Sequence, residues 1–417
     1  MNLIGRRKQF LYFLLLWCIV VIAYHPVLSN GFLDSWDEQW MVMNAHTEGG
    51  WTFENLRAIW TQNIRAQYSP LVELHYLFLY TLFGYDPLWF HLASIVWHGG
   101  CATLVFFFIR RVLLFSRSCG PRCSWSVAAL AAGLFAIHPV NVEAAAWISA
   151  VKVPMYTFFY LAALLLYMRY VESRKIVSYI GAMCCLAVSC LSKEQAFVFP
   201  LALLLLDWFG RRDLKSIKVW LEKLPFGVVS VGFALLTLAL QGEFSNAVSY
   251  SLGQRTLFGC YSLFEYITKS LVPVNLSYMY PYPISEEDTD MPSLFYIYPV
   301  LVALLLFVVY YYRKRRVFLF GCLFFLIHLL LSLHIVAIPR AWIVADRYLY
   351  LSLVSVLLLV SYGCTFFLKK AGRSWIRVLE VLLLLVYGIY LGSYTYQYGK
   401  KWKDADTLKV MKVRMKS

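Results

Sequence analysis

Long apolar runs dominate the chain, and short polar connections separate them. A window of about 19 residues, the usual scale for a membrane span, finds eleven such runs, several of them short. They cover residues 10–28, 88–114, 124–139, 151–170, 176–191, 195–209, 222–241, 293–312, 316–338, 345–368 and 374–396. The segment 70–83 is also apolar but shorter, and it contains Glu73 and His75. We expect it to form an interfacial helix rather than a span.

The composition agrees with this pattern. Of the 417 residues, 61% are hydrophobic and only 15% are charged, and the mean hydropathy is +0.63. A soluble domain has roughly 25% charged residues, and it could not bury this much apolar surface. The sequence therefore predicts an all-α polytopic membrane protein with about eleven transmembrane helices. Residues 10–28 are too long for a signal-peptide core, so we expect a retained first span.

The distribution of charge predicts how the chain is oriented. If Arg6, Arg7 and Lys8 lie inside and the spans alternate, the N-terminus and the inward connections together hold 23 of the 38 basic residues, as the positive-inside rule requires. The acidic residues show the opposite bias, with 18 of 23 facing outward. The net charge of +15 therefore reflects orientation in the bilayer, and a nucleic-acid partner is not expected.

One domain accounts for nearly the whole chain. We expect residues 1–396 to form a membrane domain with two long outward loops, 29–87 and 242–292, followed by a short basic outward tail, 397–417. Within the second loop, residues 256–271 have the pattern of an amphipathic interfacial helix.

Carboxylates follow the first span directly. Asp34, Asp37 and Glu38 lie in GFLDSWDEQW, a few residues past its end. Adjacent carboxylates at a membrane surface can accept a proton from an acceptor hydroxyl or hold a divalent cation beside a phosphate leaving group. An acidic helix start with no catalytic role is the alternative.

Other polar residues mark the outer ends of later spans. Pro139 interrupts the third run, so that His138 and Glu143 can face a cavity. Lys193 and Glu194 separate two apolar runs and could bind an anionic headgroup or simply pair with each other. A further outward pair, Asp346 and Arg347, opens the tenth run; it is a candidate functional pair or a structural ion pair in an aromatic belt.

Several motifs resemble those of a known enzyme superfamily. In chain order they are WDEQW, YSPL, LFGYDPLWFHLASIVWH, ALFAIHPVNVEAAAWISAVK, LSKEQAFVFPLALLLLDW, LVPVNLSYMYPYP and VADRYLYL. Together they span nearly the whole chain. The sequence is similar to the membrane glycosyltransferases of the GT-C superfamily, and most similar to the transmembrane and tetratricopeptide-repeat O-mannosyltransferases and their bacterial relatives.

This resemblance implies an inverting glycosyltransferase that uses a polyprenyl-phosphate sugar donor at the periplasmic or luminal face. The acidic motif at its catalytic centre corresponds to Asp37 and Glu38, which are also the candidate ligands of a divalent cation such as Mg or Mn. Groups from later outward segments would hold the donor phosphate. The candidates for this role are His138, Glu143, Lys193, Glu194, Arg255, Asp346 and Arg347.

Two departures from the family pattern affect the expected partners. After the Ala-Trp pair that ends HPVNVEAAAW, the sequence reads ISAVKVP, and Lys152 is the only basic residue of this block. The tetratricopeptide repeats expected after the last span are absent from the sequence. The acceptor could therefore be a glycan, a lipid or a protein. We expect a bacterial inner membrane with the site facing the periplasm, the alternative being the endoplasmic reticulum lumen. Competing functions are a flippase or transporter for a lipid-linked glycan and a non-catalytic scaffold in a glycan assembly complex.

Overall fold

The computed structural model describes residues 3–33, 36–65, 67–242, 250–284, 290–335, 342–370 and 374–408. Throughout these ranges the regular structure is helical, and the β-pairing consists of two isolated bridges, Ile64 with Gln67 and Tyr280 with Val344. The prediction of an all-α protein is confirmed for this part of the chain. Asp34 lies outside the described residues.

The helices follow one another through short connections. The α-helices are α1 (Leu3–Tyr24), α2 (Glu38–Met41), α3 (Ala45–Glu48), α4 (Phe53–Thr61), α5 (Pro70–Phe83), α6 (Pro87–Phe115), α7 (Pro121–Ala136), α8 (Val142–Ala146), α9 (Lys152–Ser173), α10 (Ile176–Ser192), α11 (Phe199–Phe209), α12 (Ile217–Leu221), α13 (Leu224–Gly242), α14 (Leu252–Leu271), α15 (Ile297–Tyr312), α16 (Arg316–Leu329), α17 (Leu349–Lys370) and α18 (Ser374–Lys400). Short 3-10 helices connect or extend them: η1 (His25–Ser29), η2 (Pro139–Asn141), η3 (Ile148–Val151), η4 (Glu194–Val198), η5 (Ser293–Tyr296), η6 (Leu330–Ser332) and η7 (Asp346–Tyr348).

Helix boundaries coincide with the signals in the sequence. Proline stands at the first position of α5, α6 and α7, where its missing N–H costs nothing. At the start of α14, Ser251 and Gln254 form a capping box. The predicted helix over 70–83 coincides with α5, and the amphipathic segment 256–271 lies within α14.

Seven helices of the described chain are long and apolar enough to cross a membrane, or eight if the pair Pro121–Ala136 and Pro139–Ala146, bent by 52° at the break, is one span. The apolar helices Pro70–Phe83, Ile176–Ser192 and Arg316–Ser332 are shorter. All eleven predicted runs lie mainly on helices, and the chain is a multi-pass helical protein. The number eleven itself stays a prediction.

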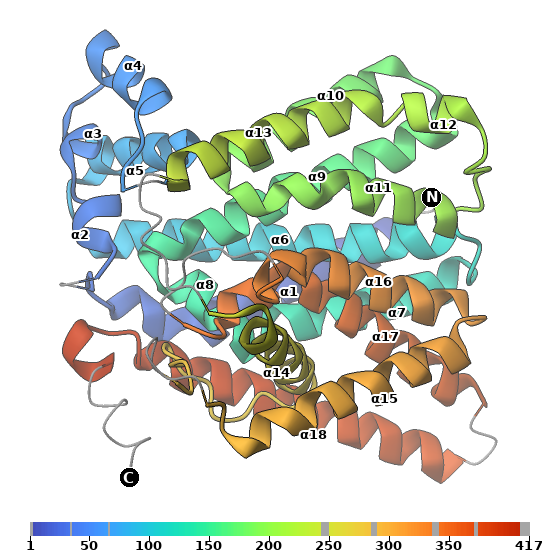
Figure 1. The fold of residues 1–417 in the computed structure, drawn as a ribbon. Coiled ribbons are helices and arrows are strands. Elements are labelled where there is room, and N and C mark those ends of the chain that lie inside the picture. Colours follow the sequence, from blue (N-terminus) through green and yellow to red (C-terminus); the bar gives the residue numbers. More distant parts are fainter. Residues whose placement is uncertain are drawn as a thin grey trace.

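The long helices run side by side from one end of the molecule to the other, with the start of α1 at one end and the end of α18 at the opposite end (Figure 1). Helix α6 occupies the interior, and small residues allow its neighbours to come close. A Cβ atom on Gly99 of α6 would lie 2.7 Å from the indole of Trp17 in α1. This contact packs α1 closely against α6.

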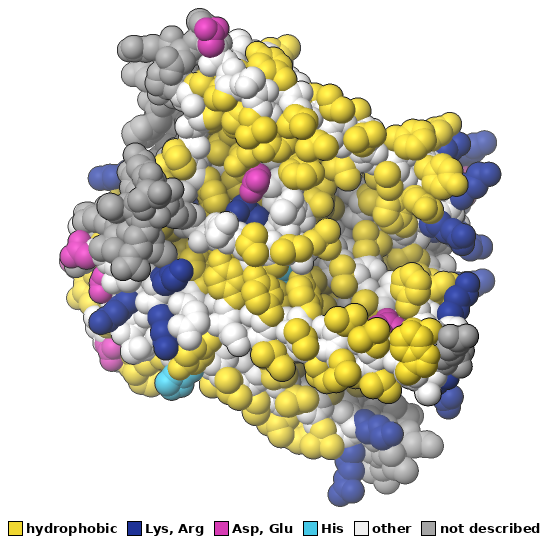
Figure 2. All heavy atoms as spheres, turned by 90° about the horizontal axis from the view of Figure 1, so that it is seen from below, with side chains coloured by type: hydrophobic (Ala, Val, Ile, Leu, Met, Phe, Trp, Pro, Cys, Tyr) yellow, Lys and Arg dark blue, Asp and Glu magenta, His cyan; other side chains and the backbone are white. Residues whose placement is uncertain are grey.

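The outer surface of the bundle is apolar. Helix α15 contributes no buried residue, and side chains such as Leu304 and Phe307 of α15 and Leu382 and Val386 of α18 are exposed. Figure 2 shows one such face covered by hydrophobic side chains, with Lys and Arg concentrated at one end of it. An apolar surface of this extent is suited to lipid.

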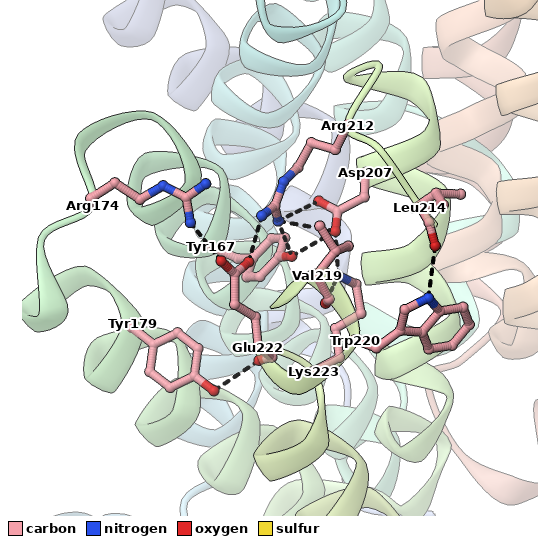
Figure 3. A network of polar contacts seen from close by, with 10 residues as sticks. All are labelled: Tyr167, Arg174, Tyr179, Asp207, Arg212, Leu214, Val219, Trp220, Glu222 and Lys223. Atoms are coloured by element: carbon pink, nitrogen blue, oxygen red, sulfur yellow. Dashed lines mark hydrogen bonds and ion pairs between the residues drawn. The ribbon is translucent and has the colours of Figure 1, made fainter. Parts of the chain in front are cut away.

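Buried charges at one end of the bundle are paired with one another (Figure 3). Asp207 of α11 accepts hydrogen bonds from Tyr167 (2.9 Å) and Arg212 (3.1 Å) and also binds Lys223. Glu222 forms ion pairs with Arg174 at 2.5 Å and Arg212 at 2.7 Å. This network joins the end of α9 to the connection between α11 and α13, opposite the end of α9 that begins at Lys152. Its carboxylates, predicted to face inward, are accounted for structurally.

Candidate active site

Most of the polar residues singled out in the sequence lie where helices end at the other end of the bundle. Glu38 begins α2, Glu143 belongs to α8, Lys152 begins α9, Lys193 follows α10 and Arg347 belongs to η7. These five elements are far apart in the chain, and the packing of α6, α8, α9 and α17 brings their ends together. The predicted concentration of charge on one face is therefore also a concentration in space.

Glu38 fastens the first loop to the bundle. Its side chain is buried, and its carboxylate accepts hydrogen bonds from the backbone N–H of Leu33 and, at 3.1 Å, from that of Ile148. The second bond crosses 110 residues of sequence. Because backbone donors occupy both oxygens, Glu38 fixes the position of the neighbouring Asp37 and is poorly placed to bind substrate.

Asp37 is the more accessible of the two carboxylates. It is partly exposed, and its side chain does not cap the helix that follows it. Its chain neighbour Trp36 contacts Trp147, whose ring centre lies 5.3 Å from the Arg347 guanidinium. Asp37 is therefore the carboxylate of the first-loop pair that is open to a ligand, beside the elements that hold Arg347.

Glu143 and Arg347 form a buried ion pair between α8 and η7. The guanidinium of Arg347 binds Oε1 of Glu143, and the backbone N–H of Arg347 donates to Oε2 at 2.7 Å. The same guanidinium lies 5.3 Å from the ring centre of Trp147 and 5.2 Å from that of Tyr348. One carboxylate and two aromatic faces therefore fix the orientation of this cation.

Asp346 attaches the second outward loop, residues 242–292, to the candidate site through a bond with Tyr280. Its buried carboxylate accepts hydrogen bonds from the Tyr280 hydroxyl at 2.9 and 3.1 Å. Burial, together with the Asp346 charge, raises the pKa of the Tyr280 hydroxyl well above its ordinary value, so it stays a neutral donor. The ammonium of Lys269 lies 4.4 Å from the centre of the Tyr280 ring. Tyr280 lies in the motif LVPVNLSYMYPYP, but nothing in the sequence predicts this bond.

Two lysines lie at the same end of the bundle. Lys193 is buried, and its Nζ lies 3.5 Å from Oε1 of Glu194. Nζ of Lys152 donates to Oε1 of Gln67 at 2.6 Å. Burial raises the pKa of the Glu194 carboxyl, but the charges of Lys193 and Lys152 outweigh burial and hold this pKa below its usual value. Lys152 was absent from the predicted set, although it is the basic residue that follows the Ala-Trp pair of HPVNVEAAAW.

Two other residues predicted to bind the donor, His138 and Arg255, form hydrogen bonds with backbone groups. The buried His138 donates from Nε2 to the Ser270 carbonyl at 3.3 Å and accepts the Val140 N–H at Nδ1. Arg255 of α14 donates from Nε to the His334 carbonyl at 3.1 Å and also binds the Ile335 carbonyl. Both side chains hold backbone in place, and their predicted role in donor binding gains no geometric support from these contacts.

The residues do not fit a metal cage. Within the described ranges, no three His, Cys, Asp or Glu side chains gather in a group that could hold an ion. Glu38, one of the two predicted ligands, uses its oxygens for backbone amides. The basic side chains at this end of the bundle include Lys193 and Arg347, and each is paired with a carboxylate.

These features define an all-α multi-pass membrane protein with a charged site at one end of the bundle. No protein-family model matches the chain. The chain is similar to a protein O-mannosyl-transferase of Caenorhabditis elegans, with 27% identity over 425 aligned positions that cover 96% of this chain. The chain spans only 57% of the length of that relative.

Proposed function

We propose that the protein is a membrane glycosyltransferase that transfers a sugar, mannose in the first instance, from a polyprenyl-phosphate donor to an acceptor hydroxyl. One arrangement supports the proposal: both chain neighbours of Asp37 bind the part of the molecule that holds Arg347. Glu38 accepts the Ile148 N–H at 3.1 Å. Trp36 contacts Trp147, whose ring centre lies 5.3 Å from the Arg347 guanidinium. The name of the nematode relative supports the choice of mannosyl transfer. The site would face the periplasm or the lumen of the endoplasmic reticulum.

The chemistry is a single displacement. Asp37 accepts the proton of the acceptor hydroxyl as its oxygen attacks the anomeric carbon. The bond between that carbon and the phosphate oxygen breaks, and the polyprenyl phosphate leaves with the electron pair. Arg347, Lys152 and Lys193 stabilise the charge that develops on the phosphate. A single displacement inverts the configuration at the anomeric carbon.

The acceptor class is a separate part of the proposal. A glycan, a lipid or a protein can each present a hydroxyl to Asp37. Mass spectrometry of the polyprenyl-linked sugars that accumulate when the gene is deleted would identify the donor. Comparison of the glycans, glycolipids and glycoproteins of the same cells would identify the acceptor through the product that disappears.

The test of the reaction uses purified protein in lipid nanodiscs with labelled polyprenyl-phosphate mannose and membranes of the deletion strain as acceptor source. Asp37→Asn should reduce transfer at least 100-fold, because general bases contribute about 10²–10⁴-fold. Asp213→Asn changes an exposed carboxylate at the opposite end and serves as the matched control, with activity near that of the wild type. Unchanged transfer by Asp37→Asn would refute the assignment.

The same preparation separates the competing functions. A flippase would move labelled donor across liposomes without forming product. A scaffold would sustain glycan output in cells that carry an Asp37→Asn and Glu38→Gln double variant. The polar cluster lies at helix ends rather than at a midplane, where transporter sites are usually found, and this favours the transferase.

A further inference from the structure

The segment that follows the last long helix packs against the candidate site. Trp402 is buried, and its ring stacks on that of Trp147 with centroids 6.1 Å apart and planes 27° apart. Trp402 lies just beyond the end of α18, whereas Trp147 lies between α8 and η3. A residue at the end of the last helix therefore contacts the middle of the site.

Trp147 also contacts Arg347 and Trp36, the residue before Asp37. On one side, the Arg347 guanidinium lies 5.3 Å from its ring centre. On another, Trp36 meets it edge to face at 6.0 Å, and Trp36 directly precedes Asp37 in the chain. The indole of Trp147 thus contacts both the chain neighbour of the proposed base and the proposed phosphate-binding cation.

Two hydrogen bonds connect the same segment to the start of the first loop. The Asn30 side chain donates to the Gly399 carbonyl, and the Gly31 N–H donates to the Lys403 carbonyl, each at 3.0 Å. Downstream, Asp404 accepts hydrogen bonds from the Thr407 N–H at 2.7 Å and from the Thr407 hydroxyl at 2.6 Å. The segment is therefore ordered at both ends of Trp402.

We propose that Trp402 is a positioning residue, which holds Trp147 so that Arg347 and Asp37 keep the separation needed for transfer. The inference rests on the proposed function for its kinetic consequence, but the contact it invokes exists independently of the reaction. Removal of the Trp402 ring leaves space on one face of Trp147, and Arg347 loses the firm surface on which its guanidinium rests. Donor binding should suffer because Arg347 contacts the donor phosphate in the proposed mechanism.

The kinetic test compares three variants in nanodiscs. Trp402→Ala should raise the KM for polyprenyl-phosphate mannose at least fivefold, whereas Trp402→Phe should stay within threefold of the wild type because a stacked ring is retained. Phe209→Ala is the matched control, since Phe209 is buried and stacks on Phe320 at 4.3 Å. It should lower thermal stability without changing KM. An unchanged KM in Trp402→Ala, or an equal rise in Phe209→Ala, would overturn the proposal.

A second measurement does not depend on activity. Hydrogen exchange followed by mass spectrometry should show faster amide exchange in peptides covering residues 29–41 and 142–151 of Trp402→Ala but not of Phe209→Ala. If the wild type transfers no sugar, the proposed function fails, and the exchange data still decide whether Trp402 positions the site. If Trp402→Ala does not fold, Trp402→Leu takes its place with the same expected results. Unchanged exchange in both peptides would rule out the positioning role.

Discussion

Arg347 is bound twice by Glu143, a residue 204 positions earlier in the chain, once through its backbone N–H at 2.7 Å and once through its guanidinium. The two-point attachment fixes both the main chain of η7 and the direction of the cation. Glu143 is almost completely buried, so the pair also holds α8 against the start of α17. A single ion pair thereby sets the geometry of one half of the proposed site.

Removal of one residue of the Glu143 and Arg347 ion pair should lower the free energy of unfolding more than removal of both. Glu143→Ala leaves the guanidinium without its counter-charge, and we expect the free energy of unfolding to fall by about 3–5 kcal/mol. The Glu143→Ala and Arg347→Met double variant should be more stable than Glu143→Ala alone, because the lone buried charge is gone. Unfolding in mixed detergent micelles measures both values. Glu172→Ala breaks a more exposed pair with Arg111 and should cost less than about 1 kcal/mol. Equal losses in both single variants would contradict this account.

Much of the helical framework could be predicted from the sequence because hydropathy reports local composition. The segment 70–83 coincides with α5, and runs such as 88–114 and 374–396 correspond to α6 and α18. Hydropathy does not report where a helix breaks. The run 124–139 leads into a bend at Pro139, and the run 195–209 divides into η4 and α11. The count of spans depends on such breaks.

The site was harder to predict because pairing is a property of packing. The sequence placed Glu143 and Arg347 at the same side of the membrane, but it gave no reason to pair them across 204 residues. It also could not distinguish Asp37 from Glu38, since two adjacent carboxylates look alike until the backbone amides of Leu33 and Ile148 are placed. Lys152 could have been predicted, because it is the basic residue that ends the motif ALFAIHPVNVEAAAWISAVK. Tyr280 had none, because nothing in its motif points to Asp346.

The pair of Lys193 and Glu194 should make stability depend on pH. The pKa of Glu194 is lower in the folded protein than its ordinary value of 4.5, so ionised Glu194 stabilises the fold. That contribution is complete above about pH 4.5 and is lost as the pH falls through the folded-state pKa. Thermal unfolding of the wild type and of Glu194→Gln should therefore differ most near pH 6–7, and the difference should shrink as the pH falls from about 4.5 through the folded-state pKa of Glu194. A constant difference from pH 7 to pH 3.5 would show that Glu194 does not titrate as described.

Chelation should leave the proposed transfer intact. The described residues offer no group of three metal-binding side chains, and Lys152, Lys193 and Arg347 can supply the positive charge that a phosphate leaving group requires. We expect transfer from polyprenyl-phosphate mannose to persist after dialysis against EDTA. Arg347→Met should instead reduce transfer about 10²–10³-fold, a loss typical of a removed electrostatic donor. Loss of activity in EDTA that Mg or Mn restores would show that the reaction needs a cation.

The bond between Tyr280 and Asp346 should contribute to the order of the second outward loop. Tyr280→Phe removes the hydroxyl that donates to both oxygens of the buried Asp346 and accepts the Ser277 N–H at 2.7 Å. A buried polar group that loses its hydrogen-bond partner costs about 1–3 kcal/mol, and we expect a loss of stability of that size. Tyr296→Phe, at an exposed tyrosine, is the control and should change stability by less than about 0.5 kcal/mol. Hydrogen exchange of residues 274–284 should rise in Tyr280→Phe alone, because the loop loses its attachment to η7. Equal stability of the two variants would mean that other contacts hold the loop.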